Sequence, residues 1–214
     1  QGKDWEAVVL KIWGRRNSIN VQKVMWTVAE LGLAHEHADA GMSHGVVGEP
    51  WYRSLNPNGL VPTIDDGGVV LWESNAIVRY LAARHAPGRL IPEDIIARAR
   101  AEMWMDWQQT TPMVGLSPLF LGLLRTPPEN RDMAAIRTAA QSAEAAMRIL
   151  DTHLANRPFM VADHLTVADI PLGCVAYRWY ALPIERGDFP NLRAWYERLT
   201  ERPAFAVHVM LPLT

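Results

Sequence analysis

Apolar and polar positions in the first third of the chain alternate between strand-like and helix-like patterns. Residues 8–13 (VVLKIW) are rich in β-branched and apolar side chains, which is typical of a buried strand. Gly32 is suited to end the helix that follows, because glycine readily adopts the left-handed backbone of a C-terminal cap. Within that helix, which begins at Ser18, apolar residues recur at the 3.6-residue period, at Val21, Val24, Met25 and Val28.

Further strand-like runs and a second helix complete this first unit. Residues 35–38 form a possible second strand, and residues 40–60 form a long loop that contains glycine and proline. Residues 61–65 and 69–72 are short apolar runs joined by Asp-Gly-Gly, a spacing that favours a hairpin. Residues 73–85 return to helical spacing. The first 85 residues therefore predict an α/β unit with a mixed sheet.

The pattern changes after residue 85. Ala-Pro-Gly at 86–88 and Ile-Pro at 91–92 indicate a linker. From residue 93 onward the patterns are helical only. We expect one helix over residues 95–111, which breaks near Pro112 and continues to residue 125. Further helices are expected over residues 133–154, 167–180 and 192–201. The predicted fold class is α/β plus all-α, with domains at residues 1–85 and 93–214.

The charge balance of the 214-residue chain is 21 basic against 23 acidic residues, a net charge of −2. This argues against a nucleic-acid-binding class, because such proteins present a broad basic field to phosphate. No segment reaches the roughly 18 apolar residues that cross a membrane. The first residues also lack the parts of a signal peptide. We therefore expect a cytoplasmic protein that binds neither nucleic acid nor membrane.

The single cysteine, Cys174, excludes an intramolecular disulfide, a CxxC redox pair and a four-cysteine zinc site. It lies in an apolar helical run, which is typical of a buried thiol rather than a reactive one. A metal site is conceivable at residues 35–39, because His35, His37 and Asp39 alternate along a possible strand and would share one of its faces. An exposed strand edge explains the same residues better, so we expect no metal.

A proline at the entry of the third predicted strand is the first candidate binding feature. A cis bond before Pro62 would turn the backbone of Val61 outward, where its N–H and carbonyl could pair with an extended peptide. A trans proline at a strand start is the alternative, and trans bonds are far more common.

Two helix starts are the other candidates. Ser74 follows Glu73 at the start of a helix, where backbone N–H groups bind carboxylates and Glu73 could pair with an ammonium group; a simple helix cap is the alternative. Ser18 begins the first helix and has no histidine near it in sequence, so a hydrogen-bond donor is favoured over a nucleophile. A donor in the positive field of a helix start stabilises a thiolate, and the adjacent Arg15 and Arg16 could add to that field.

These motifs together resemble the cytosolic glutathione S-transferase family, in its serine-type, bacterial theta- or phi-like form. The resemblance rests on NSINVQKV, NPNGLVPTI, ESNAI, the helical second half and HLTVADI, in that order along nearly the whole chain. In HLTVADI, Thr166 would cap a helix, Asp169 would complete a capping box, and Leu165 and Ile170 would form the hydrophobic staple.

The resemblance implies a thioredoxin-like first domain and glutathione as co-substrate. Val61 would pair its backbone with the cysteinyl part of glutathione next to a cis Pro62, while Glu73 and Ser74 would hold the γ-glutamyl head. Ser18 would stabilise the thiolate, with Asn20 and Asn17 as rival donors. The reactive sulfur would then come from the ligand, which agrees with the absence of cysteine at the first helix start.

One position departs from the family pattern. A polar residue that binds the glycine carboxylate often precedes the Val-Pro pair, and here that residue is Leu60. We name His44, in the long loop, as the first choice of substitute, with Asn58 and Arg53 as the alternatives. The acceptor pocket is assigned to Trp107, Thr111 and Met113 at the domain interface, with plain core packing as the alternative.

The expected activity is attack of the glutathione thiolate on a small hydrophobic electrophile, as in detoxification. Other glutathione-dependent reactions (peroxidase, isomerase, dehalogenase or ether-cleaving lyase) share the same half-site, and a non-catalytic binding module is a further alternative. The resemblance also implies a two-fold homodimer.

Overall fold

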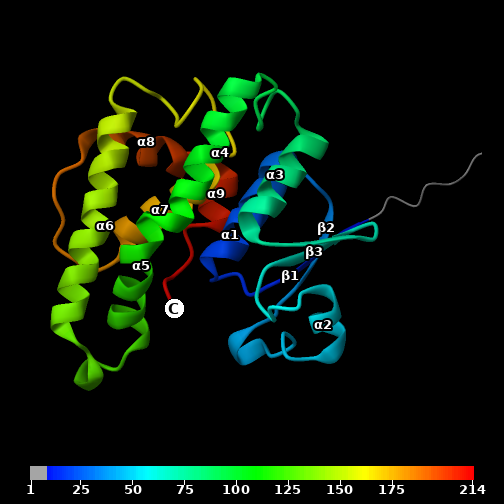
Figure 1. The fold of residues 1–214 in the computed structure, drawn as a ribbon, viewed down its shortest axis with the longest axis horizontal. Helices are drawn as coiled ribbons and strands as arrows, with labels where there is room; N and C mark the ends of the chain where they lie inside the picture. The colour runs from blue at the N-terminus through cyan, green and yellow to red at the C-terminus, as the bar shows by residue number, and fades with distance from the viewer. Residues whose placement is uncertain (1–8) are drawn as a thin grey trace, which may run out of the picture.

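A mixed four-stranded sheet forms the N-terminal part of the computed structural model, which describes residues 9–214 (Figure 1). Its strands are β1 (Leu10–Trp13), β2 (His35–Ala38), β3 (Thr63–Asp66) and β4 (Val69–Trp72), arranged in the order β2-β1-β3-β4. β1 runs parallel to β2 and antiparallel to β3, and β3 and β4 form the predicted hairpin. Val8, in the predicted first strand, lies outside the described residues.

Two helices of this part pack on the sheet, α1 (Ile19–Leu31) and α3 (Ser74–His85). The predicted period is confirmed, since the apolar face of α1 is buried with residues of β1, β3 and α3 in one cluster. Gly32 ends α1 at a φ of 65°, and its N–H donates to the carbonyl of Ala29, as the cap prediction requires.

The predicted loop over residues 40–60 is partly wrong. It contains a single 3-10 turn, Met42–His44, and a short helix, α2 (Pro50–Leu55), which begins with proline in its first turn. A helix of six residues shows too little apolar repetition to be recognised by period. Its one fully buried side chain is Tyr52, which matters for the site below.

The remaining chain is helical as predicted. It forms α4 (Ile95–Thr110), α5 (Pro112–Phe120), α6 (Met133–Leu154), α7 (Asp169–Ala181), α8 (Pro190–Thr200) and α9 (Pro203–His208), with a π-helical turn at Leu121–Arg125 and a 3-10 turn at Pro128–Asn130. Pro112 starts α5 and so separates two helices, while α9 was not predicted. The architecture thus confirms an α/β part followed by an all-α part. The domain bounds 1–85 and 93–214 remain our interpretation.

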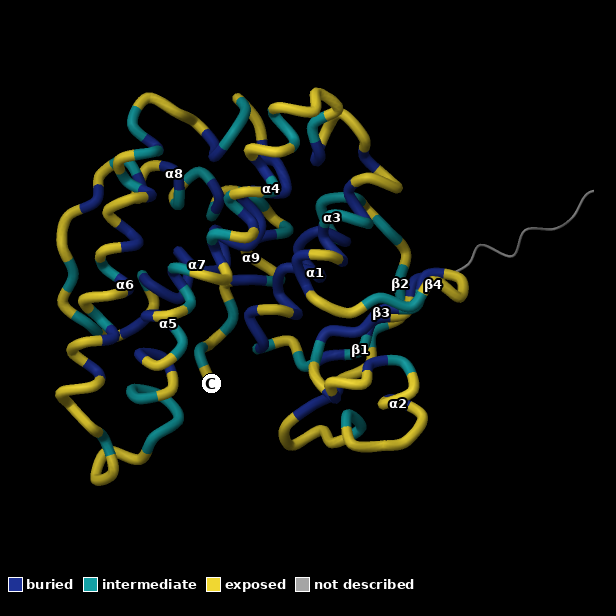
Figure 2. The backbone as a smooth tube through the Cα atoms, viewed as in Figure 1, coloured by how far each residue is buried: buried dark blue, intermediate teal, exposed yellow. Residues whose placement is uncertain are grey.

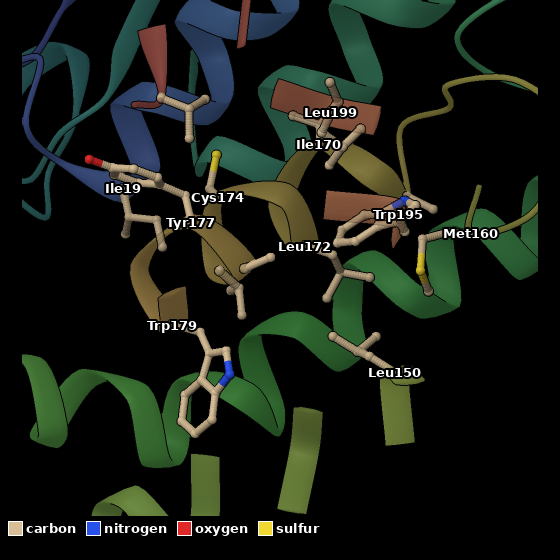
Figure 3. Packing of buried hydrophobic residues seen from close by; sticks show 14 of the residues in the cluster. Ile19, Leu150, Met160, Ile170, Leu172, Cys174, Tyr177, Trp179, Trp195 and Leu199 are labelled. Atoms are coloured by element: carbon tan, nitrogen blue, oxygen red, sulfur yellow. The ribbon is translucent and has the colours of Figure 1, made fainter. Parts of the chain in front are cut away.

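Helix α7 is the centre of the helical part. Its side chains are buried on all sides, and Figure 3 shows Leu172, Cys174 and Trp179 of α7 among residues from α1, α6 and α8. Figure 2 shows the same contrast along the backbone, with α7 mostly buried and the outer face of α6 exposed.

The start of α7 partly confirms the capping prediction. The Asp169 carboxylate accepts from the Thr166 N–H at 2.9 Å and from the Thr166 hydroxyl at 3.1 Å. The helix itself begins at Asp169, so the predicted start at residue 167 is two residues early. Leu165 and Ile170, the predicted staple pair, are both buried in the larger cluster.

The two parts of the chain share core residues. Ile19 and Trp26 of α1 and Val78 of α3 belong to the cluster of the helical part. The predicted linker also packs into that cluster, because Leu90 and Ile91 are buried there. α1 therefore lies between both parts, as Figure 1 shows, with its N-terminal end at their junction.

Candidate functional site

The segment before β3 presents an unpaired peptide edge. The Val61–Pro62 bond is cis, as the functional interpretation of this proline expected. Neither the N–H nor the carbonyl of Val61 forms a hydrogen bond within residues 9–214. The preceding carbonyl, that of Leu60, accepts from the Tyr52 hydroxyl at 2.7 Å and the Asn56 amide at 3.0 Å. Buried α2 contacts thus hold this edge in place.

The start of α3 lies beside that edge. Glu73 occupies the cap position with a φ of 70°, a left-handed backbone that is unusual for a non-glycine residue and is found at functional sites. Its side chain makes no capping bond, so it does not block the N–H groups of the first turn. The buried Ser74 hydroxyl lies 3.3 Å from the Asn20 side-chain oxygen, to which it donates.

These residues line one small pocket of about 50 Å³. Val61, Pro62, Glu73 and Ser74, which the sequence assigned to one ligand, therefore come together. Five other residues complete the lining: Asn20, Asn56, Asn58, Leu60 and Trp72.

Ser18 lies at the neighbouring cavity, of about 290 Å³, between α1 and the helical part. Ser18 is the cap residue of α1, yet its hydroxyl makes no capping bond and is therefore available to another acceptor. Asn20 lines this cavity as well as the small pocket. Met113, one of the predicted acceptor residues, also lines it. The cavity wall further contains Arg15, Ile19, Met42, Ser117, Phe120, Leu121, Arg125 and Arg178.

Four predicted site residues lie elsewhere. The Asn17 amide donates to the Thr214 hydroxyl, and Asn17 lines neither the small pocket nor the cavity. His44 is exposed at the end of the 3-10 turn. Trp107 packs edge-on against Trp104, with ring centres 5.0 Å apart, as the core-packing alternative expects. Thr111 is half-buried at the junction of α4 and α5 and lines neither hollow.

A buried lysine behind the small pocket escaped sequence reasoning. The Lys23 ammonium donates to the Gln108 side-chain oxygen at 2.9 Å and to the Ser74 hydroxyl at 3.4 Å. Burial lowers the pKa of Lys23 to about 8, and the nearby Glu73 carboxylate opposes that shift. Lys23 therefore supports Ser74 from inside the protein. The sequence did contain one sign of this burial, because Lys23 lies among the apolar residues of α1.

The shifted pKa of Lys23 predicts a pH-dependent stability. The folded state loses this proton near pH 8, whereas an unfolded lysine keeps it to about pH 10.4, so the cost of burying the charge is present below pH 8 and relieved above it. From pH 7 to pH 9 we expect the wild type to gain roughly 1 kcal/mol of unfolding free energy relative to Lys23→Met. Urea denaturation at both pH values measures this.

The exposed Lys11 provides the matched control. Lys11→Met should follow the wild type across the same pH range. A constant difference between the wild type and Lys23→Met at both pH values would show that Lys23 is not the titrating group.

The histidines of β2 do not form a metal site in the described part of the chain. A ring nitrogen of His35 bonds the Leu33 carbonyl at 3.0 Å, and one of His37 bonds the Gly14 carbonyl at 2.7 Å. No group of three potential metal ligands occurs among residues 9–214. Burial raises the pKa of the Cys174 thiol to about 12, which agrees with an inert cysteine.

Comparison with known proteins covers almost the whole chain. Residues 8–83 match the family model of the glutathione S-transferase N-terminal domain, and residues 116–203 match that of the C-terminal domain. The chain is 41% identical over 208 residues to glutathione S-transferase GstB of Escherichia coli K12, covering 96% of this chain and all of the relative. It is 31% identical to glutathione S-transferase 3 of Zea mays, covering 92% and 91% of the two chains.

Comparison with solved structures also finds glutathione S-transferases. The theta class glutathione S-transferase of Xanthomonas axonopodis pv. citri, crystallised with glutathione bound, superposes with a TM-score of 0.93 at 45% identity, over 96% of this chain and 99% of the other. Glutathione transferase BmGSTD1 of Bombyx mori superposes with a TM-score of 0.84 at 26% identity, over 94% of this chain and 92% of the other. Among the described residues, no helix is long and apolar enough to cross a membrane.

Proposed function

Because the chain belongs to the glutathione S-transferase family, we propose that the small pocket at Val61 and the cavity at Ser18 are the two halves of its transferase site. The protein is a glutathione transferase with a thioredoxin-like N-terminal part and a helical C-terminal part. The observation that carries the assignment is that Asn20 lines both hollows, so a tripeptide in one has its thiol beside the other.

The small pocket binds the backbone of glutathione. The free N–H and carbonyl of Val61 pair with the cysteinyl residue, as in the addition of a strand. The γ-glutamyl carboxylate accepts from the Ser74 hydroxyl and the first N–H groups of α3, and Glu73 pairs with the ammonium group. Leu60 supplies no donor at the glycyl end. The exposed amide of Asn58, which lines the pocket, is therefore a candidate there beside His44.

The cavity activates the thiol and receives the electrophile. The Ser18 hydroxyl donates to the sulfur at the N-terminal end of α1, where the helix field favours a negative charge. The thiolate then attacks a small electrophile, whose apolar part contacts Met113 and its apolar neighbours in the cavity wall. Trp107 and Thr111 line neither the small pocket nor the cavity, so we do not assign them to the electrophile.

Binding and turnover test this function together. The purified protein should be retained on glutathione resin and should conjugate glutathione to 1-chloro-2,4-dinitrobenzene. Ser74→Ala should raise the KM for glutathione about tenfold and leave kcat within about threefold, because it removes a hydrogen bond to a charged group.

Ser54→Ala is the matched control, since that hydroxyl lies on the exposed face of α2 and donates to the Trp51 carbonyl. Retention without turnover would indicate a binding module. Absence of both would refute the proposal.

Two further expectations of the family belong to the proposal, a two-fold homodimer and a cytoplasmic location. The sheet-edge strand β4 carries the partly exposed apolar side chains of Val69 and Trp72, which a partner could cover. Light scattering of the purified protein gives its mass in solution.

A further inference from the structure

Three arginines converge on the cavity that contains Ser18. Arg15 comes from the loop after β1, Arg125 from the end of the π-helical turn, and Arg178 from the last turn of α7. The three are far apart in sequence, so the fold alone brings them together. No aspartate or glutamate lines this cavity, and none of the three guanidinium groups pairs with an aspartate or glutamate side chain within residues 9–214.

Holding these cations together is unfavourable without a counter-charge. Burial, together with the nearby Arg125 and Arg15, lowers the pKa of Arg178 to about 10. Burial and Arg125 likewise lower the pKa of Arg15. The Nε atoms of all three are buried without a hydrogen-bond partner in the described part of the chain. Unsatisfied buried donors of this kind call for an explanation, and an absent anionic ligand provides one.

The existing contacts of the three arginines leave N–H donors free to bind an anionic ligand. One Nη of Arg178 donates to the Asn17 carbonyl at 3.3 Å, and its guanidinium stacks 4.2 Å from the Phe120 ring centre. Arg125 contacts the Met42 sulfur at 3.1 Å and the main-chain oxygen of Thr214. The Arg15 guanidinium makes no hydrogen bond within residues 9–214. These contacts orient the groups, and within residues 9–214 none of them is to an aspartate or glutamate side chain.

We propose that the electrophile of this transferase carries a carboxylate, which the Arg15, Arg125 and Arg178 guanidinium groups bind while Ser18 holds the attacking sulfur. This inference rests on the proposed function, because it names the substrate class of the same site. The apolar side chains of the cavity wall accept the uncharged part of such a molecule. Guanidinium groups suit this task because their planar donors match the two oxygens of a carboxylate.

A matched pair of probes isolates the charge. 4-Chloro-3,5-dinitrobenzoate and 4-chloro-3,5-dinitrobenzamide differ in one substituent of similar shape. In both, the thiolate sulfur bonds to the ring carbon that carries chlorine, the C–Cl bond breaks, chloride leaves with the electron pair, and the thiol proton passes to solvent. Corrected for the uncatalysed rates, the wild type should show at least about tenfold higher kcat/KM for the acid than for the amide.

Substitutions then locate the carboxylate site. Arg15→Gln and Arg125→Gln should each lower kcat/KM for the acid about tenfold or more, and that for the amide by less than about threefold. The KM for glutathione should not change by more than that. Arg137→Gln is the control, because Arg137 is exposed on α6 and absent from the cavity wall.

Three results would overturn the inference: no preference for the acid in the wild type, equal losses on both probes, or a rise in the KM for glutathione that accounts for the loss. The last would mean that the arginines bind a carboxylate of glutathione instead. All three leave the proposed function standing, since it depends on turnover of any electrophile.

A binding measurement decides the matter even without turnover. Calorimetry with 3,5-dinitrobenzoate, which has no leaving group, should give a Kd that rises about tenfold or more in Arg15→Gln and Arg125→Gln but not in Arg137→Gln. If 3,5-dinitrobenzamide binds as tightly as the acid, the inference is wrong, whatever the activity.

Discussion

Asp169→Ala is expected to lower the free energy of unfolding by about 4 kcal/mol or more, the largest effect of any substitution considered for this protein. The carboxylate is fully buried and accepts four hydrogen bonds. They come from the N–H and hydroxyl of Thr166, from the Met160 N–H at 2.9 Å and from the Trp195 indole at 2.9 Å. Alanine leaves these donors unpaired among apolar side chains such as those in Figure 3.

Two further variants make the Asp169 test specific. Asp169→Asn keeps the shape of the side chain and one acceptor oxygen, so its free energy of unfolding should lie between those of the wild type and the alanine variant. Asp188→Ala, at an exposed position whose side chain forms no hydrogen bond or ion pair within residues 9–214, should leave the unfolding free energy unchanged within error. Urea denaturation measures all three. A loss below about 1 kcal/mol for Asp169→Ala would mean that the four bonds do not hold α7 to α8 and to the chain before it.

Ser18→Ala should raise the pH midpoint of kcat/KM by about one to two units, because the thiolate of bound glutathione loses a hydrogen bond to its charged form. At pH 6.5 this corresponds to a loss of about 10- to 100-fold. At pH 9 the free thiol is itself mostly ionised, so the loss should shrink to about threefold or less. The pH dependence of conjugation with 1-chloro-2,4-dinitrobenzene measures both values.

The two asparagines are the comparison for Ser18. Asn17 lines neither hollow and is engaged with Thr214, so Asn17→Ala should keep the wild-type midpoint. Asn20 accepts from the Ser74 hydroxyl, so Asn20→Ala should chiefly raise the KM for glutathione. If the midpoint moves in Asn20→Ala and stays in place in Ser18→Ala, then Asn20 is the donor to the sulfur.

The fold was predictable where a periodic pattern extends over several turns. α6 matches its predicted bounds, and α1 ends at Gly32 as expected, because long one-sided apolar faces and glycine caps leave local signals. α2 and α9, of six residues each, leave almost none. The linker predicted at residues 86–92 packs into the core of the helical part, which its sequence does not indicate. Proline and glycine mark its turns, but only tertiary packing buries Leu90 and Ile91.

The residues of the candidate site likewise divide into those with a local sequence signal and those without one. Ser18, Pro62 and Ser74 each stand at the boundary of a strand or helix, so their local sequence shows where their hydroxyl or backbone groups are free. Arg125 and Arg178 carry no such mark, because a lone arginine on a helix looks like a solvated charge until the fold turns it inward. A cluster made from distant segments is a property of the tertiary structure, and no local motif encodes it.

The division of α1 between two clusters limits how this protein can move. Val24 and Met25 pack on the sheet while Ile19 and Trp26 pack into the helical part, so one rigid rod is anchored in both cores. A hinge motion that opened the cleft between the two parts would have to pull one of these faces out of its core. The aperture in front of Ser18 is therefore fixed. We therefore expect ligands to enter by small rearrangements of exposed side chains that line the cavity, such as Met42 and Leu121, rather than by separation of the two parts.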